Sequence, residues 1–241
     1  MSFVQAIRRR LRPLNVADYT RGLIEGGDCK VAVDIGCGSR SHLSAFRPKI
    51  VTIGIDAHPA AIDNAKKNQL HDHYIIADIV KTGVDEIIKQ AEGVGGIDLV
   101  CLYEVIEHLP KSAGFEILER CERLTRKMVI VETPNGFVEQ GPEFGNEFQR
   151  HLSGWFIHDF EGRGYKVFGT TGTRYLRGYA AGAKYDFPGC ILLDEFLTLF
   201  LRINGNPKHA YNLVAIKDVR GVPARLNSDL PCASDKGGSR G

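Results

Sequence analysis

The sequence lacks any close pair of cysteines, and it lacks long hydrophobic runs. Its six cysteines are far apart, with no C-x-x-C pair, so neither a disulfide framework nor a zinc ribbon is predicted. We therefore expect reduced thiols in a cytoplasmic protein. No apolar run approaches the roughly 20 residues that cross a bilayer, and no signal-peptide core follows Met1. These absences predict a soluble protein with no transmembrane segment.

The chain also has little net charge. A formal charge of +2 over 241 residues gives no general attraction to nucleic acid, so no nucleic-acid partner is expected. One local exception is the N-terminal stretch FVQAIRRRLRP, in which four arginines lie beside Phe3, Val4, Ile7 and Leu11. This spacing predicts a short basic amphipathic helix. Such a helix either packs its apolar side on the domain or contacts a membrane or RNA.

Apolar strand-like runs alternate with helix-like segments along the chain. This alternation is typical of a parallel sheet covered by helices on both faces, whose strands are buried and nearly continuous in apolar residues. We expect seven strands and a Rossmann-like α/β fold. The predicted strands are residues 31–35, 50–55, 73–77, 99–103, 128–132, 165–172 and 211–218.

The helical segments place one insertion in the second half of the chain. Helices are predicted at residues 58–69, 85–92, 110–126 and 190–203, and another is predicted from an N-cap at Ser153 to a stop at Gly164. The last two strands are separated by residues 174–210, which we interpret as a substrate lid or a subunit contact. We expect a single domain over residues 1–218 and a disordered tail over 219–241. The oligomeric state is left open, with a homodimer as one option.

The first strand ends in the sequence VAVDIGCGSR, residues 31–40, whose glycines favour a tight turn close to a ligand. Dinucleotide-binding turns need a third glycine, but this chain has Ser41 at that position. Asp34 lies two residues before Gly36, where it suits a cofactor with an ammonium group better than a diphosphate. The turn therefore favours a nucleotide cofactor other than NAD.

Four motifs in order extend this pattern over roughly residues 28–165. They are VDIGCGS, VTIGIDAHPAAID, IIADI and IDLVCLYEVIEHLP. The sequence thereby resembles the class I S-adenosylmethionine-dependent methyltransferases of the small-molecule type. Arg40 departs from the family pattern, which usually has a glycine at this position.

The resemblance implies S-adenosylmethionine as cofactor and a set of residues that bind it. Asp56, which ends the second strand, has a carboxylate suited to the two vicinal ribose hydroxyls. The turn implies backbone contacts to the methionine end, and Glu104 closes the fourth strand beside the methyl-transfer site. The implied cofactor-binding residues are Asp34, Gly36, Cys37, Gly38, Asp56, Ala57, Asp78, Ile79 and Glu104.

His108 is the catalytic candidate, because it is the histidine within the fourth motif. A neutral imidazole there removes a proton from the acceptor, or else it only positions its loop. No metal ligand is assigned. An alternative hypothesis is a site for Mg²⁺ or Mn²⁺, because the stretch RHLSGWFIHDF resembles one in 3′-terminal RNA methyltransferases. Its ligands would be Glu104, Glu107, His108 and His151, the last from this stretch.

The predicted function is methyl transfer from S-adenosylmethionine to a small-molecule acceptor, most simply to its oxygen. One alternative is a metal-dependent 3′-terminal RNA ribose or catechol-type O-methyltransferase. A second is a non-catalytic cofactor-binding scaffold subunit, for which Arg40 is the hint, and an NAD-dependent reductase is disfavoured by Ser41. The sequence does not identify the acceptor.

Overall fold

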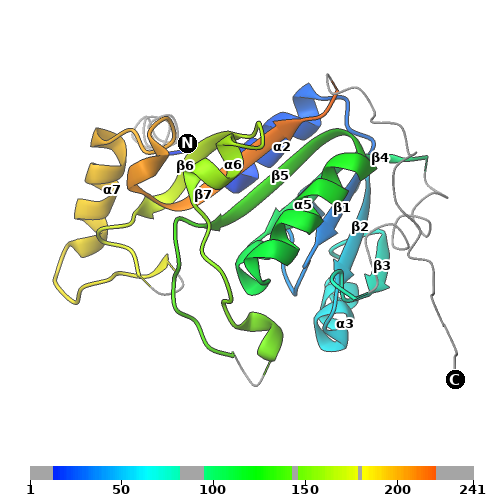
Figure 1. Ribbon diagram of the computed structural model, residues 1–241, viewed down its shortest axis with the longest axis horizontal. Helices are drawn as coiled ribbons and strands as arrows, with labels where there is room; N and C mark the ends of the chain where they lie inside the picture. Colours follow the sequence, from blue (N-terminus) through cyan, green and yellow to red (C-terminus); the bar gives the residue numbers. More distant parts are fainter. Residues whose placement is uncertain (1–12, 82–94, 143–145, 179–180, 221–241) are drawn as a thin grey trace, which may run out of the picture.

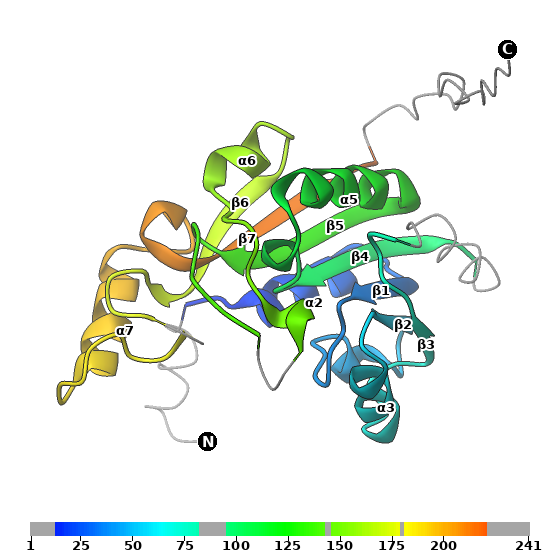
Figure 2. The same cartoon turned by 60° about the horizontal axis from the view of Figure 1, so that its bottom comes forward.

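The computed structural model describes residues 13–81, 95–142, 146–178 and 181–220. They form a seven-stranded sheet with the order β3-β2-β1-β4-β5-β7-β6 (Figure 1 and Figure 2). The strands are β1 (Val31–Ile35), β2 (Val51–Asp56), β3 (His73–Ile76), β4 (Ile97–Tyr103), β5 (Thr125–Pro134), β6 (Lys166–Thr173) and β7 (Ala210–Asp218). The predicted Rossmann-like fold is confirmed.

Strand direction brings the ends of six strands to one edge of the sheet. Strands β1 to β5 are mutually parallel, and β7 is antiparallel to both β5 and β6. The carboxyl ends of β1 to β6 therefore lie at one edge, together with the start of β7. Ligands of open α/β sheets bind outside this carboxyl edge.

Helices cover both faces of the sheet (Figure 1). Helices α5 (Lys111–Leu124) and α6 (Ile157–Glu161) cover one face, and α2 (Val16–Gly26) covers the other. Helix α3 (Pro59–Lys67) packs beside β2 and β3. All five residues of β1 are buried, with Val31, Val33 and Ile35 in one core cluster and Ala32 in the other. Burial on both faces explains why its sequence is an apolar run.

The predicted start of the helix at Ser153 is wrong. Helix α6 begins only at Ile157, and Ser153 is a buried residue whose Oγ donates to the Ile106 carbonyl at 3.2 Å. Trp155 is fully buried and donates from Nε1 to the same carbonyl at 3.1 Å. This packing holds the chain extended before the helix, and it overrides the local capping preference of serine.

The insertion predicted between the last two strands is present. Its helix, α7 (Cys190–Phe200), follows the carboxyl end of β6 and lies at one end of the molecule, away from α3, in both views (Figure 1 and Figure 2). The predicted N-terminal helix, the helix at 85–92 and nearly all of the tail fall outside the described residues. No helix in the described ranges is long and apolar enough to cross a membrane.

Candidate active site

The glycine turn after β1 is held against the end of β2. The backbone N–H groups of Gly36 and Cys37 both donate to the Ile55 carbonyl, at 2.8 and 3.0 Å. Gly36 and Gly38 have φ of +69° and +55°, a conformation that other residues adopt with strain. A Cβ on Gly36 would stand 2.5 Å from Val105 Cγ2, whereas one on Gly38 would meet nothing closer than 4.0 Å. The turn is therefore tight on the protein side at Gly36 and open at Gly38.

Asp56 joins this turn to the end of β2. Its Oδ2 accepts from the Gly38 N–H at 2.9 Å, and its Oδ1 accepts from the His58 N–H at 2.8 Å. Each carboxylate oxygen has a second lone pair. The partly buried side chain can therefore hold the turn and still accept hydrogen bonds from a ligand diol. Ala57, which follows it, is also partly buried.

Asp34 lies beneath the turn rather than on its open side. Its carboxylate is 2% exposed, accepts from Ser41 Oγ at 2.5 Å, and lies 3.6 Å from His71 Nε2. Direct contact with a cofactor ammonium stays a prediction. What the geometry shows is that Asp34 holds Ser41 and thereby the end of the glycine turn.

Burial changes the protonation of Asp34 and His71. It raises the pKa of Asp34 to about 7 and lowers the pKa of His71 to about 4, because both charged forms lose water. The nearby Asp56 charge adds to the upward shift at Asp34. Near neutral pH the buried pair therefore tends toward protonated Asp34 and neutral His71.

Asp34→Asn should change how stability depends on pH. The folded pKa of Asp34, about 7, lies above its unfolded value near 3.9, so its contribution is complete below pH 4 and is lost as pH rises toward 7. We expect the free energy of unfolding of the wild type to fall by a few kcal/mol relative to Asp34→Asn over this window. Urea unfolding at several pH values measures this difference, and His71 titrates in both proteins. Parallel curves would contradict the pKa assignment.

Asp78 and Ile79 lie at the end of β3. Asp78 Oδ1 accepts from the Val80 N–H at 3.0 Å, which closes the turn after the strand. Its Oδ2 lies 3.3 Å from Lys81 Nζ, and Ile79 is 8% exposed. Asp78 is thus at the same carboxyl edge as Asp56, two strand ends from the glycine turn. Contact with an adenine ring stays a prediction for both residues.

Glu104 follows β4 in a strained conformation. Its φ is +54°, which is uncommon for a residue with a side chain. The exposed side chain accepts from Asn212 Nδ2 at 2.7 Å, and the Glu104 N–H donates to the Glu132 carbonyl at 2.9 Å. β5 and β7 thus hold Glu104 at the carboxyl edge.

Glu107, His108 and His151 lie together beside Glu104. Ligand atoms of these three side chains all lie within 4.8 Å of one another, and the two imidazole rings are 4.7 Å apart. Glu107 is 1% exposed, and its Oε2 accepts from Thr133 Oγ1 at 2.9 Å. Its buried Oε1 receives no hydrogen bond from the described part of the chain. A buried acceptor without a donor is unfavourable unless a ligand or ion satisfies it.

The two histidines are oriented by backbone carbonyls. His108 Nδ1 lies 3.2 Å from the Arg150 carbonyl, and His151 Nδ1 lies 2.7 Å from the Val138 carbonyl. Contact with a carbonyl fixes the proton on Nδ1 and leaves Nε2 as the acceptor. Burial lowers the pKa of His108 to about 4, so the ring is neutral at pH 7. It is therefore a weak base but a competent metal ligand.

Three supporting residues were not found from the sequence. Asn212 and Glu132 hold Glu104, and His71 packs against Asp34. Polar residues within the apolar runs YNLVAIKD and VIVETP were the available indication for Asn212 and Glu132. His71 lies in the link before β3, where no periodicity indicated burial.

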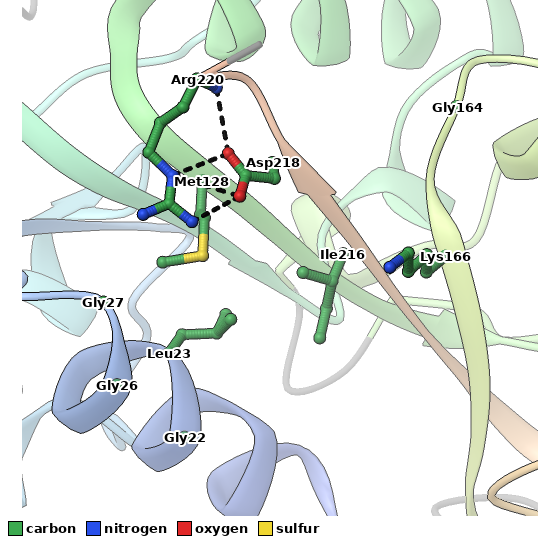
Figure 3. A pocket seen from close by; sticks show the side chains of 10 residues that line it. All are labelled: Gly22, Leu23, Gly26, Gly27, Met128, Gly164, Lys166, Ile216, Asp218 and Arg220. Carbon is green, nitrogen blue, oxygen red and sulfur yellow. Dashed lines mark hydrogen bonds and ion pairs between the residues drawn. The ribbon is translucent and has the colours of Figure 1, made fainter.

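A separate depression of about 460 Å³ lies at the opposite edge of the sheet (Figure 3). It lies between α2, the start of β6 and the end of β7, with Lys166 at its side (Figure 3). Arg220 Nε donates a hydrogen bond to Asp218 Oδ1 at 2.9 Å within it. No predicted site residue lines it. The depression is therefore distinct from the candidate site.

Comparisons with known proteins agree with this arrangement. Residues 33–129 match the family model described as a methyltransferase domain. This match spans the glycine turn, Asp56, Asp78 and the loop after β4. The prediction of a methyltransferase enzyme is confirmed for this part of the chain. No curated protein matches the sequence.

Solved structures with similar folds include three methyltransferases. The plantazolicin methyltransferase BpumL, in complex with a pentazolic desmethylPZN analog and S-adenosylhomocysteine (SAH), has a TM-score of 0.50 and 18% identity, over 84% of this chain and 82% of that chain. A SAM-dependent methyltransferase from Archaeoglobus fulgidus has a TM-score of 0.49 and 16% identity, over 90% and 100%. The methyltransferase domain of bacterial CtHen1 has a TM-score of 0.46 and 18% identity, over 87% and 97%. At 18% identity, the similarity to the plantazolicin methyltransferase supports the fold alone.

Proposed function

We propose that this protein transfers a methyl group from S-adenosylmethionine to a small-molecule acceptor, most simply to an oxygen atom. The observation that carries the proposal is the open glycine turn at Gly38 joined to Asp56, within the part of the chain that matches a methyltransferase domain. The residues fit the cofactor, because each Asp56 carboxylate oxygen can accept one hydrogen bond beyond the one it makes in the protein, and Gly38 has no Cβ to block the turn. The cofactor supplies an activated methyl group, and the chain supplies orientation.

The chain's own groups have distinct roles in this proposal. The turn and Asp56 bind the cofactor, while Glu104 and the loop after β4 face the methyl-transfer position at the carboxyl edge. His108 is the candidate group for holding the acceptor proton. Because its pKa is low, His108 is a weak base. Its Nε2 therefore accepts a hydrogen bond from the acceptor and holds the acceptor in position.

Asp56→Ala should weaken SAH binding at least tenfold. The substitution removes a charge-assisted acceptor from the ligand and two hydrogen bonds that hold the turn, and each such bond is worth roughly 1.5–3 kcal/mol. Calorimetric titration with SAH measures the change. Asp63→Ala, on the outer side of α3, is the matched control and should bind as the wild type does. Unchanged affinity in Asp56→Ala would remove Asp56 from the cofactor site.

A second candidate function is metal-assisted methylation of an acceptor with vicinal hydroxyls, such as a 3′-terminal RNA ribose or a catechol. The cluster of Glu107, His108 and His151, with the unsatisfied Glu107 Oε1, favours it. One carboxylate and two imidazoles would hold a divalent ion. Such an ion lowers the pKa of a bound hydroxyl, which a histidine of low pKa does not do. Glu104 lies beside the cluster as the remaining carboxylate of the sequence pattern.

A further inference from the structure

Helix α7 turns its polar side toward the protein. Its buried residues are Cys190, Asp194 and Thr198. Asp194 is fully buried, and its Oδ1 accepts from the N–H and Oγ1 of Thr173 at 2.8 and 2.7 Å. Its Oδ2 accepts from Arg177 Nε at 2.5 Å. These contacts to the end of β6 fix the rotation of the helix about its axis.

The opposite side of α7 is apolar and faces solvent. Six of its side chains are exposed large hydrophobics, and Leu192, Phe196 and Phe200 are 70%, 61% and 72% exposed. The full set is Ile191, Leu192, Leu193, Phe196, Leu199 and Phe200. A surface helix of a soluble domain normally has the reverse pattern, with apolar residues inward. A contiguous exposed apolar surface of this kind marks an interaction site.

The insertion that carries this apolar face also has exposed basic and aromatic residues. Exposed cations in the described part of the insertion are Arg174, Lys184, Arg202 and Lys208, against the exposed acids Asp186 and Glu195. Tyr175 and Tyr185 are also exposed, at 47% and 50%. Tyrosine and basic residues around an apolar surface are typical of the membrane interface.

The first described residues of the chain lie just after α7 in space. Leu14 exchanges two backbone hydrogen bonds with the side chain of Asn204, at 3.0 and 2.8 Å, just after α7. The sequence immediately before Leu14 contains four arginines, at positions 8, 9, 10 and 12. The sequence that precedes this contact is therefore positively charged.

We propose that the apolar face of α7 docks on the surface of a lipid bilayer containing anionic lipids. The helix has 11 residues and a length of about 16 Å, so it suits the interface and is too short to span the bilayer. A second copy of this chain fits less well. A two-fold interface would bring two insertions with an excess of exposed cations together, and these would repel each other, whereas anionic lipid attracts them.

Co-sedimentation with vesicles tests this proposal. The full-length protein should bind vesicles of phosphatidylcholine mixed with phosphatidylglycerol, bind phosphatidylcholine alone more weakly, and lose affinity as salt is raised. Leu192→Glu combined with Phe196→Glu should reduce binding at least roughly tenfold. Ile76→Glu is the matched control, because Ile76 is 53% exposed on β3 at the other side of the sheet and should leave vesicle binding unchanged.

Two further measurements make each outcome decisive. Thermal melts and SAH titration of the double variant should match the wild type, which separates this proposal from the proposed function. Absence of vesicle binding by the wild type, or equal binding by the double variant, overturns the proposal. Sedimentation velocity that shows a dimer converted to a monomer by the double variant, with no vesicle binding, would assign the face to a second copy instead.

Discussion

Gly36→Ala is expected to destabilise the fold by roughly 2–5 kcal/mol and to weaken SAH binding at least tenfold. The left-handed conformation of this position costs a residue with a Cβ roughly 1–2 kcal/mol of stability. The new methyl group would stand 2.5 Å from Val105 Cγ2, and overpacking of this kind costs about 1–3 kcal/mol more. Relief requires the turn to move away from Val105, and this displaces the backbone amides that the ligand would contact. Urea unfolding without ligand, followed by SAH titration, measures both effects.

Two variants separate the causes. Gly38→Ala has a similar backbone strain but open space around its Cβ. Its free energy of unfolding should therefore fall only by the conformational cost of roughly 1–2 kcal/mol. Val105→Ala in the Gly36→Ala background should restore part of the stability, because it removes the clashing methyl groups. Equal losses in the two glycine variants, with no rescue by Val105→Ala, would show that the contact with Val105 is unimportant.

His151→Ala is expected to abolish divalent-ion binding and to lower metal-dependent methylation of a vicinal-diol acceptor at least a hundredfold, with SAH affinity unchanged. Removing one of three ligands leaves a carboxylate and one imidazole, too few to hold the ion. Calorimetric titration with Mn²⁺, Co²⁺, Zn²⁺ and Mg²⁺ measures ion binding. A methylation assay with catechol and an RNA 3′ end as acceptors measures the change in activity. His158→Ala is the matched control, because its side chain is 80% exposed on α6.

The conservative variant Glu107→Gln sharpens this test. It preserves the shape of the side chain and removes the charge that a cation needs, so it should also lose ion binding. If neither wild type nor variants bind an ion, or methylation is insensitive to chelator, the second candidate function is wrong. Glu107 and His151 then only position the loop after β4, and the metal-free proposal stands, with His108 as the candidate group for the acceptor proton.

The sequence predicted the sheet well, because its strands are buried on both faces and therefore appear as short apolar runs. β1 was predicted with its bounds, and β7 was predicted within one residue. The start of α6 was missed because Ser153 has local capping preference, whereas tertiary contacts to Ile106 decide its conformation. Where a side chain is buried in the core, its tertiary contacts outweigh its local capping preference.

The candidate site could be predicted only in part. Gly36, Asp56 and Glu104 end strands, so their common location at the carboxyl edge follows from the fold. The proximity of His108 and His151 does not follow from spacing, because 43 residues separate them and the contacts of Ser153 and Trp155 with Ile106 bring them together. The burial of Asp34 and its contact with His71 likewise required the packed structure.

Native mass spectrometry of the purified protein tests the central claim most directly. We predict a bound species with the mass of S-adenosylmethionine or SAH, either co-purified or after addition of SAH, and its loss in Asp56→Ala. Binding of NAD in place of both, or no retention of either S-adenosylmethionine or SAH at saturating concentration, would contradict the assignment of the glycine turn and Asp56 to this cofactor.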